Sequence, residues 1–162
     1  MKKMVWIISS VVAFVLLIGI ISFTWIYQIA MGQKEQGHET AIERAKKQEA
    51  DIVQVEQVET FVGKEKQFIV EGKNKQNETT YVWVPASKKE KVIAKRAKDG
   101  VTSNQAVQAV QKENTVSKLK DVQLAREGDV LLWEVTYLNE NNQYSFSYVD
   151  FSTGHVEKNV TP

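Results

Sequence analysis

The chain has no cysteine, and only two prolines and two histidines occur in its 162 residues. Without cysteine it can form neither a disulfide nor a thiolate metal site. His38 and His155 lie too far apart for a His-Glu-x-x-His motif, and the sequence contains neither a Gly-x-Ser-x-Gly elbow nor a glycine-rich phosphate loop. The 21 basic and 20 acidic side chains nearly balance, so no basic field favours nucleic acid. We therefore predict a protein without catalytic residues, metal or cofactor, and with no nucleic acid partner.

Charge is also missing from one long stretch. Residues 4–31 follow Lys2 and Lys3 and contain no charged side chain. This stretch can cross a hydrocarbon core of about 30 Å as a helix. It is too long for the apolar core of a cleavable signal peptide, and it ends with aromatic rings such as Trp25 rather than small residues. We predict a cytoplasmic tail and single-pass membrane anchor over 1–31, with the N-terminus cytoplasmic and the rest extracellular.

The remaining chain is patterned as helices and strands. Residues 32–38 are polar, contain two glycines and suit a short tether. Helix formers predict helices over 39–50, 88–98 and 103–114, the last two preceded by capping-box spacings, with Gly100 ending the middle helix in the left-handed conformation. Alternating apolar residues separated by turn residues predict strands; these cover 51–62, 66–72, 79–85, 115–127, 130–138 and 144–151. The buried face of the first strand is expected to change along its length.

The two halves of this pattern correspond at an offset of 65 residues. Residues 41–84 align with residues 106–149 without a gap. In this alignment turn residues correspond: Gly63 with Gly128, Asn74 with Asn139, and Asn77 with Asn142. Backbone geometry restricts residue choice most at turns. We predict an internal duplication and an α+β fold, in which each copy lays a helix across an antiparallel sheet and the copies pack together. The predicted parts are two subdomains, 39–86 and 102–162, and a connector helix, 87–101.

Aromatic side chains on the strands offer the candidate interaction surface. Trp83 and Trp133 are expected in the core. Tyr144, Phe146 and Tyr148, which we call the aromatic row, are spaced by two and share one face of a strand. Packing of this row against the subdomain's own helix is the first interpretation, and a groove for a protein partner is the second.

Residues 150–155 bring together Asp150, Ser152, Thr153, Gly154 and His155. Such residues could form a reaction centre, but Asp, Ser and Thr also hydrogen-bond the backbone of turns and Gly accepts positive φ. We interpret the segment as a turn between two strands.

The chain has a short basic tail, one apolar span and two cysteine-free copies of a helix followed by strands, and the second copy ends in the sequence DFSTGHV. In these features it resembles the TseB (YpmB) family of Gram-positive bacilli. The resemblance implies a duplicated, PepSY-like and cystatin-like fold outside the cytoplasmic membrane. It also implies a non-catalytic regulator of cell wall elongation that binds a class B penicillin-binding transpeptidase. The first copy departs from the pattern, because PASKKEK follows Val84 where the second copy has its Asp-x-x-Thr-Gly turn. An inhibitor of an exported protease and an enzyme acting on wall polymer are the alternatives.

Overall fold

The computed structural model describes residues 16–22, 37–47 and 52–162 in two units, Met1–Gly37 and His38–Pro162. In the first unit residues 16–22 are helical, and their large apolar side chains are exposed. The rest of the predicted span 4–31 lies outside the described residues, as do most of the tether 32–38 and the end of the helix predicted over 39–50. Within the described ranges, no helix is both long and apolar enough to cross a membrane.

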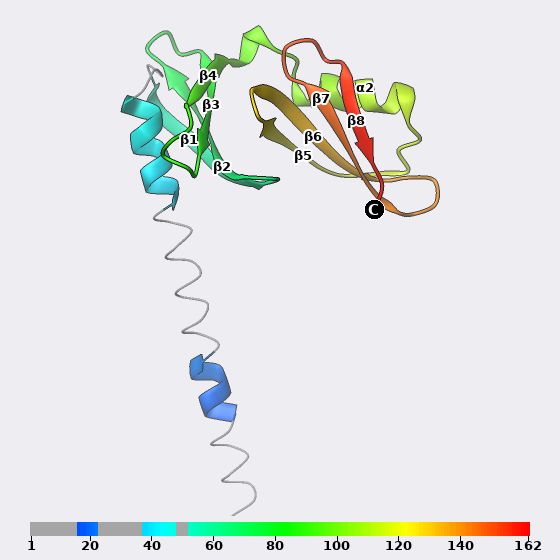
Figure 1. The fold of residues 1–162 in the computed structure, drawn as a ribbon, viewed down its shortest axis with the longest axis horizontal. Coiled ribbons are helices and arrows are strands. Elements are labelled where there is room, and N and C mark those ends of the chain that lie inside the picture. The colour runs from blue at the N-terminus through cyan, green and yellow to red at the C-terminus, as the bar shows by residue number, and fades with distance from the viewer. Residues whose placement is uncertain (1–15, 23–36, 48–51) are drawn as a thin grey trace, which may run out of the picture. The chain divides into compact units, whose positions relative to one another are not determined.

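The second unit begins with a helix whose described part ends at residue 47, followed by a four-stranded antiparallel sheet in the order β1-β2-β3-β4 (Figure 1). Ala41 and Ala45 are buried, and their small side chains let this helix lie close to the sheet. The core beneath it contains Ile52, Phe68, Val70, Val82, Val84 and Val92. The strands are β1 (Ile52–Val62), β2 (Lys66–Asn74), β3 (Thr79–Pro85) and β4 (Ile93–Arg96).

A second antiparallel sheet, β5-β6-β7-β8, follows a 3-10 turn and a helix. Thr102 caps this helix in a capping box with Gln105, as the spacing predicts. Its buried residues, Ala106 and Val110, face the sheet. The elements are η1 (Ala97–Asp99), α2 (Ser103–Glu113), β5 (Lys118–Glu127), β6 (Val130–Leu138), β7 (Tyr144–Asp150) and β8 (Val156–Val160).

Residues 65 positions apart occupy matching places in the central strand pairs of the two sheets, β2-β3 and β6-β7. Phe68 pairs with Val84, and Trp133 with Val149. The turns after β2 and β6 also match: Asn77 and Asn142 have φ values of 62° and 59°. In both turns the side-chain oxygen of an asparagine three residues earlier accepts two backbone N–H groups. The two halves therefore share strand order, the register of the central strand pair and the chemistry of the turn within that pair. The first hairpins differ in register by one residue, because Thr60 pairs with Phe68 whereas Leu124, and not Ala125, pairs with Trp133.

β1 changes its buried face, as the sequence predicts. Its register against β2 shifts twice, between Ile52 and Gln54 and between Val55 and Gln57. Each irregularity inserts a residue into the alternation and turns the following side chains to the other face. The first insertion keeps Val55 on the same side as Ile52, under the first helix. The two insertions then cancel, so Phe61, nine positions after Ile52, lies on the opposite side and belongs to the core shared with the second sheet.

The connector helix predicted over 87–101 is wrong. The chain forms a turn, then β4 and the 3-10 turn η1, and Gly100 has an extended φ of −141° rather than a left-handed one. Ile93 pairs with Trp83, so β-branched residues in a Lys-rich segment complete the sheet edge. Arginine side chains also bind the loop carbonyls that a helix would use, as described below.

The two sheets share one core. Trp83 and Ile69 of the first sheet belong to the same apolar cluster as Leu124, Trp133 and Val149 of the second. The indole N–H of Trp83 donates to the carbonyl of Ala125 at 3.0 Å, so a polar bond crosses this interface as well. The core positions predicted for Trp83 and Trp133 are confirmed, with exposures of 0% and 6%.

Candidate functional site

Residues 150–155 form a tight turn. One carboxylate oxygen of Asp150 accepts the backbone N–H groups of Ser152 and Thr153 at 2.9 and 2.7 Å and the Thr153 hydroxyl at 2.9 Å. Gly154 has a φ of 75°, and His155 is exposed. The carboxylate is committed to holding the turn, so the side chains that resemble a reaction centre in sequence serve the connection between β7 and β8. Among the described residues no group of three or more His, Asp or Glu could hold a metal.

The aromatic row faces away from α2. The alternate residues of β7, Ser145, Ser147 and Val149, are buried on the helix side. The Ser147 hydroxyl donates to the Asn159 side chain, which also accepts from Asn114 at the end of α2. Packing of the row against its own helix, the first interpretation, is therefore wrong. The small serines line the side on which the helix approaches, and the row lies on the opposite face of the sheet.

Basic side chains flank the aromatic row. Tyr144 is 54% exposed, and the Lys120 ammonium lies 5.5 Å from the centre of its ring. The Lys158 ammonium lies 5.4 Å from the centre of the Tyr148 ring. The exposed Tyr144 ring and the half-buried Tyr148 ring, each with a lysine over its face, combine apolar area with positive charge. Such a surface suits a protein partner that offers apolar and acidic groups.

Tyr148 is fixed in place by its neighbour on β6. Burial, followed by a hydrogen bond from the phenol to Glu134 and the charge of that carboxylate, raises the pKa of Tyr148 above its usual range. Gln123 also donates to Glu134, at 2.8 Å. The phenol therefore stays protonated and acts as an oriented donor, not as a base.

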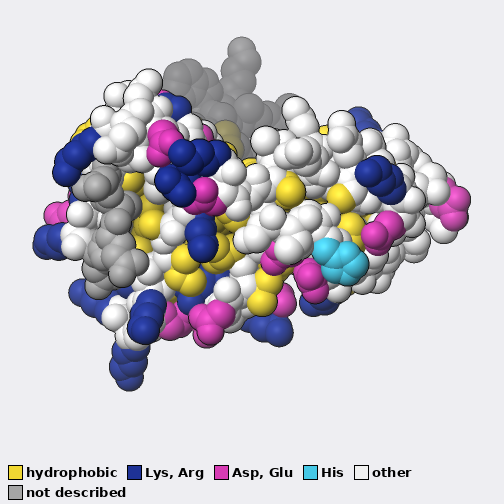
Figure 2. All heavy atoms as spheres, turned by 90° about the horizontal axis from the view of Figure 1, so that it is seen from above, with side chains coloured by type: hydrophobic (Ala, Val, Ile, Leu, Met, Phe, Trp, Pro, Cys, Tyr) yellow, Lys and Arg dark blue, Asp and Glu magenta, His cyan; other side chains and the backbone are white. Residues whose placement is uncertain are grey.

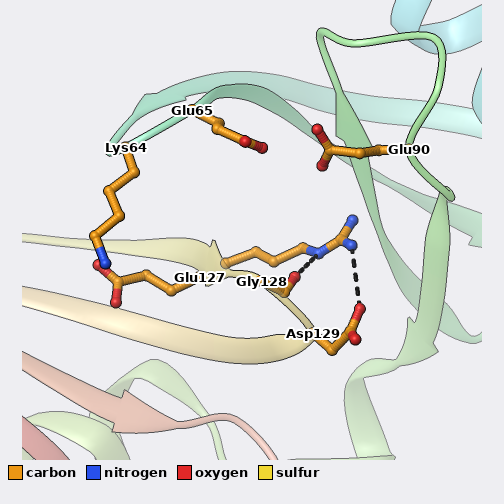
Figure 3. A pocket seen from close by; sticks show the side chains of 7 residues that line it. Lys64, Glu65, Glu90, Glu127, Gly128 and Asp129 are labelled. Carbon is orange, nitrogen blue, oxygen red and sulfur yellow. Dashed lines mark hydrogen bonds and ion pairs between the residues drawn. The ribbon is translucent and has the colours of Figure 1, made fainter.

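A polar pocket of about 610 Å³ lies where three loops meet (Figure 3). Figure 3 shows the carboxyl groups of Glu65 and Glu90 pointing toward one another across it. Their hydrogen bond, then burial and the charge of Glu65, raise the pKa of Glu90. The pocket is lined by Lys64, Glu65, Glu90, Arg126, Glu127, Gly128 and Asp129.

Arg126 ties the walls of this pocket together. Its side chain is 7% exposed, and the guanidinium donates to the carbonyls of Gly128 at 2.5 Å and Lys91 at 2.9 Å. From the first helix, Arg44 donates to the carbonyls of Pro85, Ser87 and Glu90. Two arginines therefore hold the loop between β3 and β4 by its backbone. The pocket is a structural junction whose arginine is already engaged within the protein, and sequence periodicity gives no sign of it.

The space-filling view shows how charge is distributed over one face of the second unit (Figure 2). Lysine and arginine side chains are interspersed with acidic ones, and hydrophobic side chains are exposed between them. Neither sign of charge forms a continuous field on this face. Recognition on this face would rest on local combinations of apolar, carboxylate and ammonium groups rather than on long-range attraction.

Comparison with known proteins agrees with this two-part structure. Residues 40–85 match the family described as the cell wall elongation regulator TseB-like domain, and residues 100–159 match PepSY, the peptidase propeptide and YPEB domain. The first match covers β1, β2 and β3 of the first sheet, and the second covers α2 and all of the second sheet except Val160. The chain is thus of the class that joins a TseB-like domain to a PepSY domain.

A full-length relative gives the family. A protein of Bacillus subtilis (strain 168) named probable cell wall elongation regulator TseB is 51% identical over 162 residues, which is 100% of both chains. The solved structure of the YpmB protein from Bacillus subtilis has a TM-score of 0.75 and 56% identity, over 78% of this chain and 98% of that chain. The chain belongs to the TseB family, which confirms the resemblance seen in its sequence.

Proposed function

We propose that the chain is a non-catalytic, membrane-anchored regulator of cell wall elongation that binds a class B penicillin-binding transpeptidase outside the membrane. The observation that carries this proposal is 51% identity over the full length of a protein named as a probable cell wall elongation regulator. The commitment of the Asp150 carboxylate to its turn supports the non-catalytic part of the proposal.

The domain layout is part of the proposal. Each half would be a cystatin-like subdomain, 39–86 and 102–162, that arose by duplication. The matched registers of the central strand pairs, β2-β3 and β6-β7, and the matched asparagine turns support this, because unrelated sheets have no reason to share both. Residues 87–101 connect the halves through β4 and η1 in place of a helix.

The anchor is the second part. The described helical residues 16–22 expose Leu16, Leu17, Ile20 and Ile21, each by more than half of its surface. Apolar side chains around a helix are stable in lipid and costly in water. This supports a membrane anchor over 1–31, with the tether 32–38 holding the second unit close to the bilayer.

The absence of cysteine allows a clean test of topology. Ser152→Cys, in the exposed turn after β7, would carry the only thiol. We expect a membrane-impermeant maleimide to label it in intact cells, and to label Lys3→Cys only after the membrane is opened. The reverse pattern, or equal labelling of both variants before permeabilisation, would contradict the proposed orientation.

The aromatic row is the proposed contact with the transpeptidase. Exposed aromatic rings that are rigid and already oriented contribute most to protein interfaces. A photocrosslinking residue at Phe146 in full-length protein should capture a membrane protein that a fluorescent penicillin also labels. Tyr144→Ala should reduce this capture about 30-fold, since loss of a central ring costs about 2 kcal/mol.

Matched variants separate the contact from general damage. Tyr144→Phe keeps the ring and should retain capture, and His155→Ala, exposed on the same subdomain, should leave it unchanged. If none of the captured proteins binds penicillin, the proposed partner is wrong. Equal capture by Tyr144→Ala and the parent would show that the partner uses another surface.

The match of residues 100–159 to the PepSY family, described as a peptidase propeptide domain, favours an alternative. In this case the chain would inhibit or modulate an exported protease. Inhibition of a secreted protease by the full-length protein in detergent, with unchanged capture of penicillin-binding proteins in Tyr144→Ala cells, would favour this function over the first.

A further inference from the structure

A concave surface lies between the two subdomains, and Glu134 links its lining residue Gln123 to Tyr148 of the aromatic row. It is a cleft of about 210 Å³ where β1 contacts β5. This volume is below the roughly 300–1,000 Å³ of small-molecule sites, so it suits a single side chain. The cleft is lined by Gln57, Glu59, Ile69, Glu71, Tyr81, Ser103, Val122, Gln123, Leu124 and Trp133.

The walls of the cleft are apolar and aromatic, but they carry two carboxylates. Tyr81 meets Trp133 edge to face, with ring centres 6.2 Å apart, and Ile69 and Leu124 are buried beside them. Glu59 and Glu71 are half-buried on neighbouring strands. The register pairs Glu59 with Ile69 and Gln57 with Glu71, which places the two carboxylates diagonally on one face.

These carboxylates lack a cation in the cleft. None of the described residues that line it is Lys, Arg or His. The nearby Lys73 ammonium lies 3.7 Å from Glu56, outside the lining, and only partly offsets the charge on Glu71. Gln57 donates to Glu59 at 2.7 Å but is neutral.

The pKa shifts of the groups around the cleft agree with the lack of a cation among its lining residues. Burial, and then Asp121, raise the pKa of Glu59, whereas burial, and then Glu56 and Glu59, raise the pKa of Glu71. Burial and the charges of Glu71 and Glu59 also raise the pKa of Tyr81. A positive charge placed between Glu59 and Glu71 would stabilise the ionised forms of both carboxylates.

We propose that this cleft binds a basic side chain of the protein partner, with the guanidinium of an arginine as the best fit. Two carboxylates can accept its N–H groups, and the Tyr81 and Trp133 rings can pack against its plane. Lysine would provide charge without the planar fork. The inference rests on the proposed function, because it names the chemistry of a second contact with the same partner.

The experiment places a photocrosslinking residue at Ser103, at the cleft, in the full-length protein in cells, with Phe146 in the aromatic row as the parallel site. We expect both sites to capture the same protein, and the Ser103 crosslink to map within a few residues of an Arg or Lys of that protein. Glu59→Gln with Glu71→Gln should reduce capture from Ser103 at least 10-fold. Glu113→Gln with Glu157→Gln removes the same charge from exposed positions outside the lining and should leave capture unchanged.

The melting temperature of the Glu59→Gln, Glu71→Gln double variant is an independent control for this experiment. A carboxyl group whose pKa is raised by folding stabilises the folded state below its unfolded pKa, and that contribution is lost as pH rises through the folded pKa. At neutral pH the double glutamine variant should therefore melt at the same temperature as the parent or a few degrees higher. Loss of capture without loss of stability then reports on binding and not on unfolding.

Each outcome bears on one of the two proposals. Capture from Phe146 but none from Ser103 overturns the cleft inference and leaves the proposed function standing. A crosslink that maps to a segment without Arg or Lys, to a second copy of this chain, or to the chain's own residues 32–36 also overturns it. Capture unaffected by the glutamine variant does the same, and failure of capture at both sites overturns the proposed function as well.

Discussion

Trp83→Ala is expected to lower the free energy of unfolding by about 3–5 kcal/mol, the range for removing a large buried aromatic side chain. Trp83 is fully buried, packs edge to face on Phe151 with ring centres 5.5 Å apart, and donates to the Ala125 carbonyl. The substitution removes packing and also leaves that buried carbonyl without its donor. For a unit of this size the melting temperature should fall by roughly 10–20 °C.

The location of the loss matters as much as its size. Trp83 lies on β3, but most of its cluster belongs to the second sheet. We therefore expect Trp83→Ala to increase the rate of backbone amide hydrogen exchange at Val149 on β7 as well as at Val82, the residue before Trp83 on β3. Guanidinium denaturation followed by circular dichroism gives the stability change, and native-state exchange gives its location.

Two variants serve as controls for this prediction. Trp83→Phe keeps a ring and loses the N–H donor, so it should cost about 1–3 kcal/mol. Tyr144→Ala removes an exposed ring and should change stability by less than about 0.5 kcal/mol. A loss in Trp83→Ala that raises exchange only in the first sheet would mean that the subdomains fold independently.

The sequence predicts the strands and turns well because these depend on local chemistry. Alternation locates the strands, and Asn77 and Asn142 mark turns because asparagine tolerates positive φ. The helix predicted over 88–98 fails for a non-local reason. Its lysines favour a helix, but pairing of Ile93 with Trp83 buries apolar surface at a sheet edge, and local propensity cannot offset that gain.

The candidate surfaces depend on which face of each sheet is covered, and periodicity alone leaves this open. Both alternating sets of β7 could face the helix, and hydrophobicity favours the aromatic row over Ser145 and Ser147. The serines face it instead, where Ser147 bonds Asn159. The cleft is still harder to predict, because Glu59 and Trp133 come from different copies and only the packing of the copies brings them together.

Gly100→Ala is expected to cost about 3 kcal/mol, although the backbone conformation there is ordinary. With φ of −141° any residue can adopt it, so strain is not the reason. A Cβ atom would lie 2.3 Å from the Phe151 ring and 2.5 Å from the Phe151 carbonyl oxygen, which accepts the N–H of Val101 at 2.7 Å. Phe151 is fully buried, so neither its ring nor its backbone can move freely.

Gly128 provides the contrast that identifies the mechanism. It has a φ of 59° and open space around its Cα, so its requirement is conformational. Gly128→Asn should cost under about 1 kcal/mol because asparagine tolerates that region, whereas Gly100→Asn should cost at least as much as Gly100→Ala. Because Phe151 packs on Tyr81, a wall of the cleft, Gly100→Ala should also weaken crosslinking from Ser103 more than from Phe146. Equal melting temperatures for Gly100→Ala and the parent would mean that Phe151 can move away from the connector, and that the connector does not fix how the two subdomains meet.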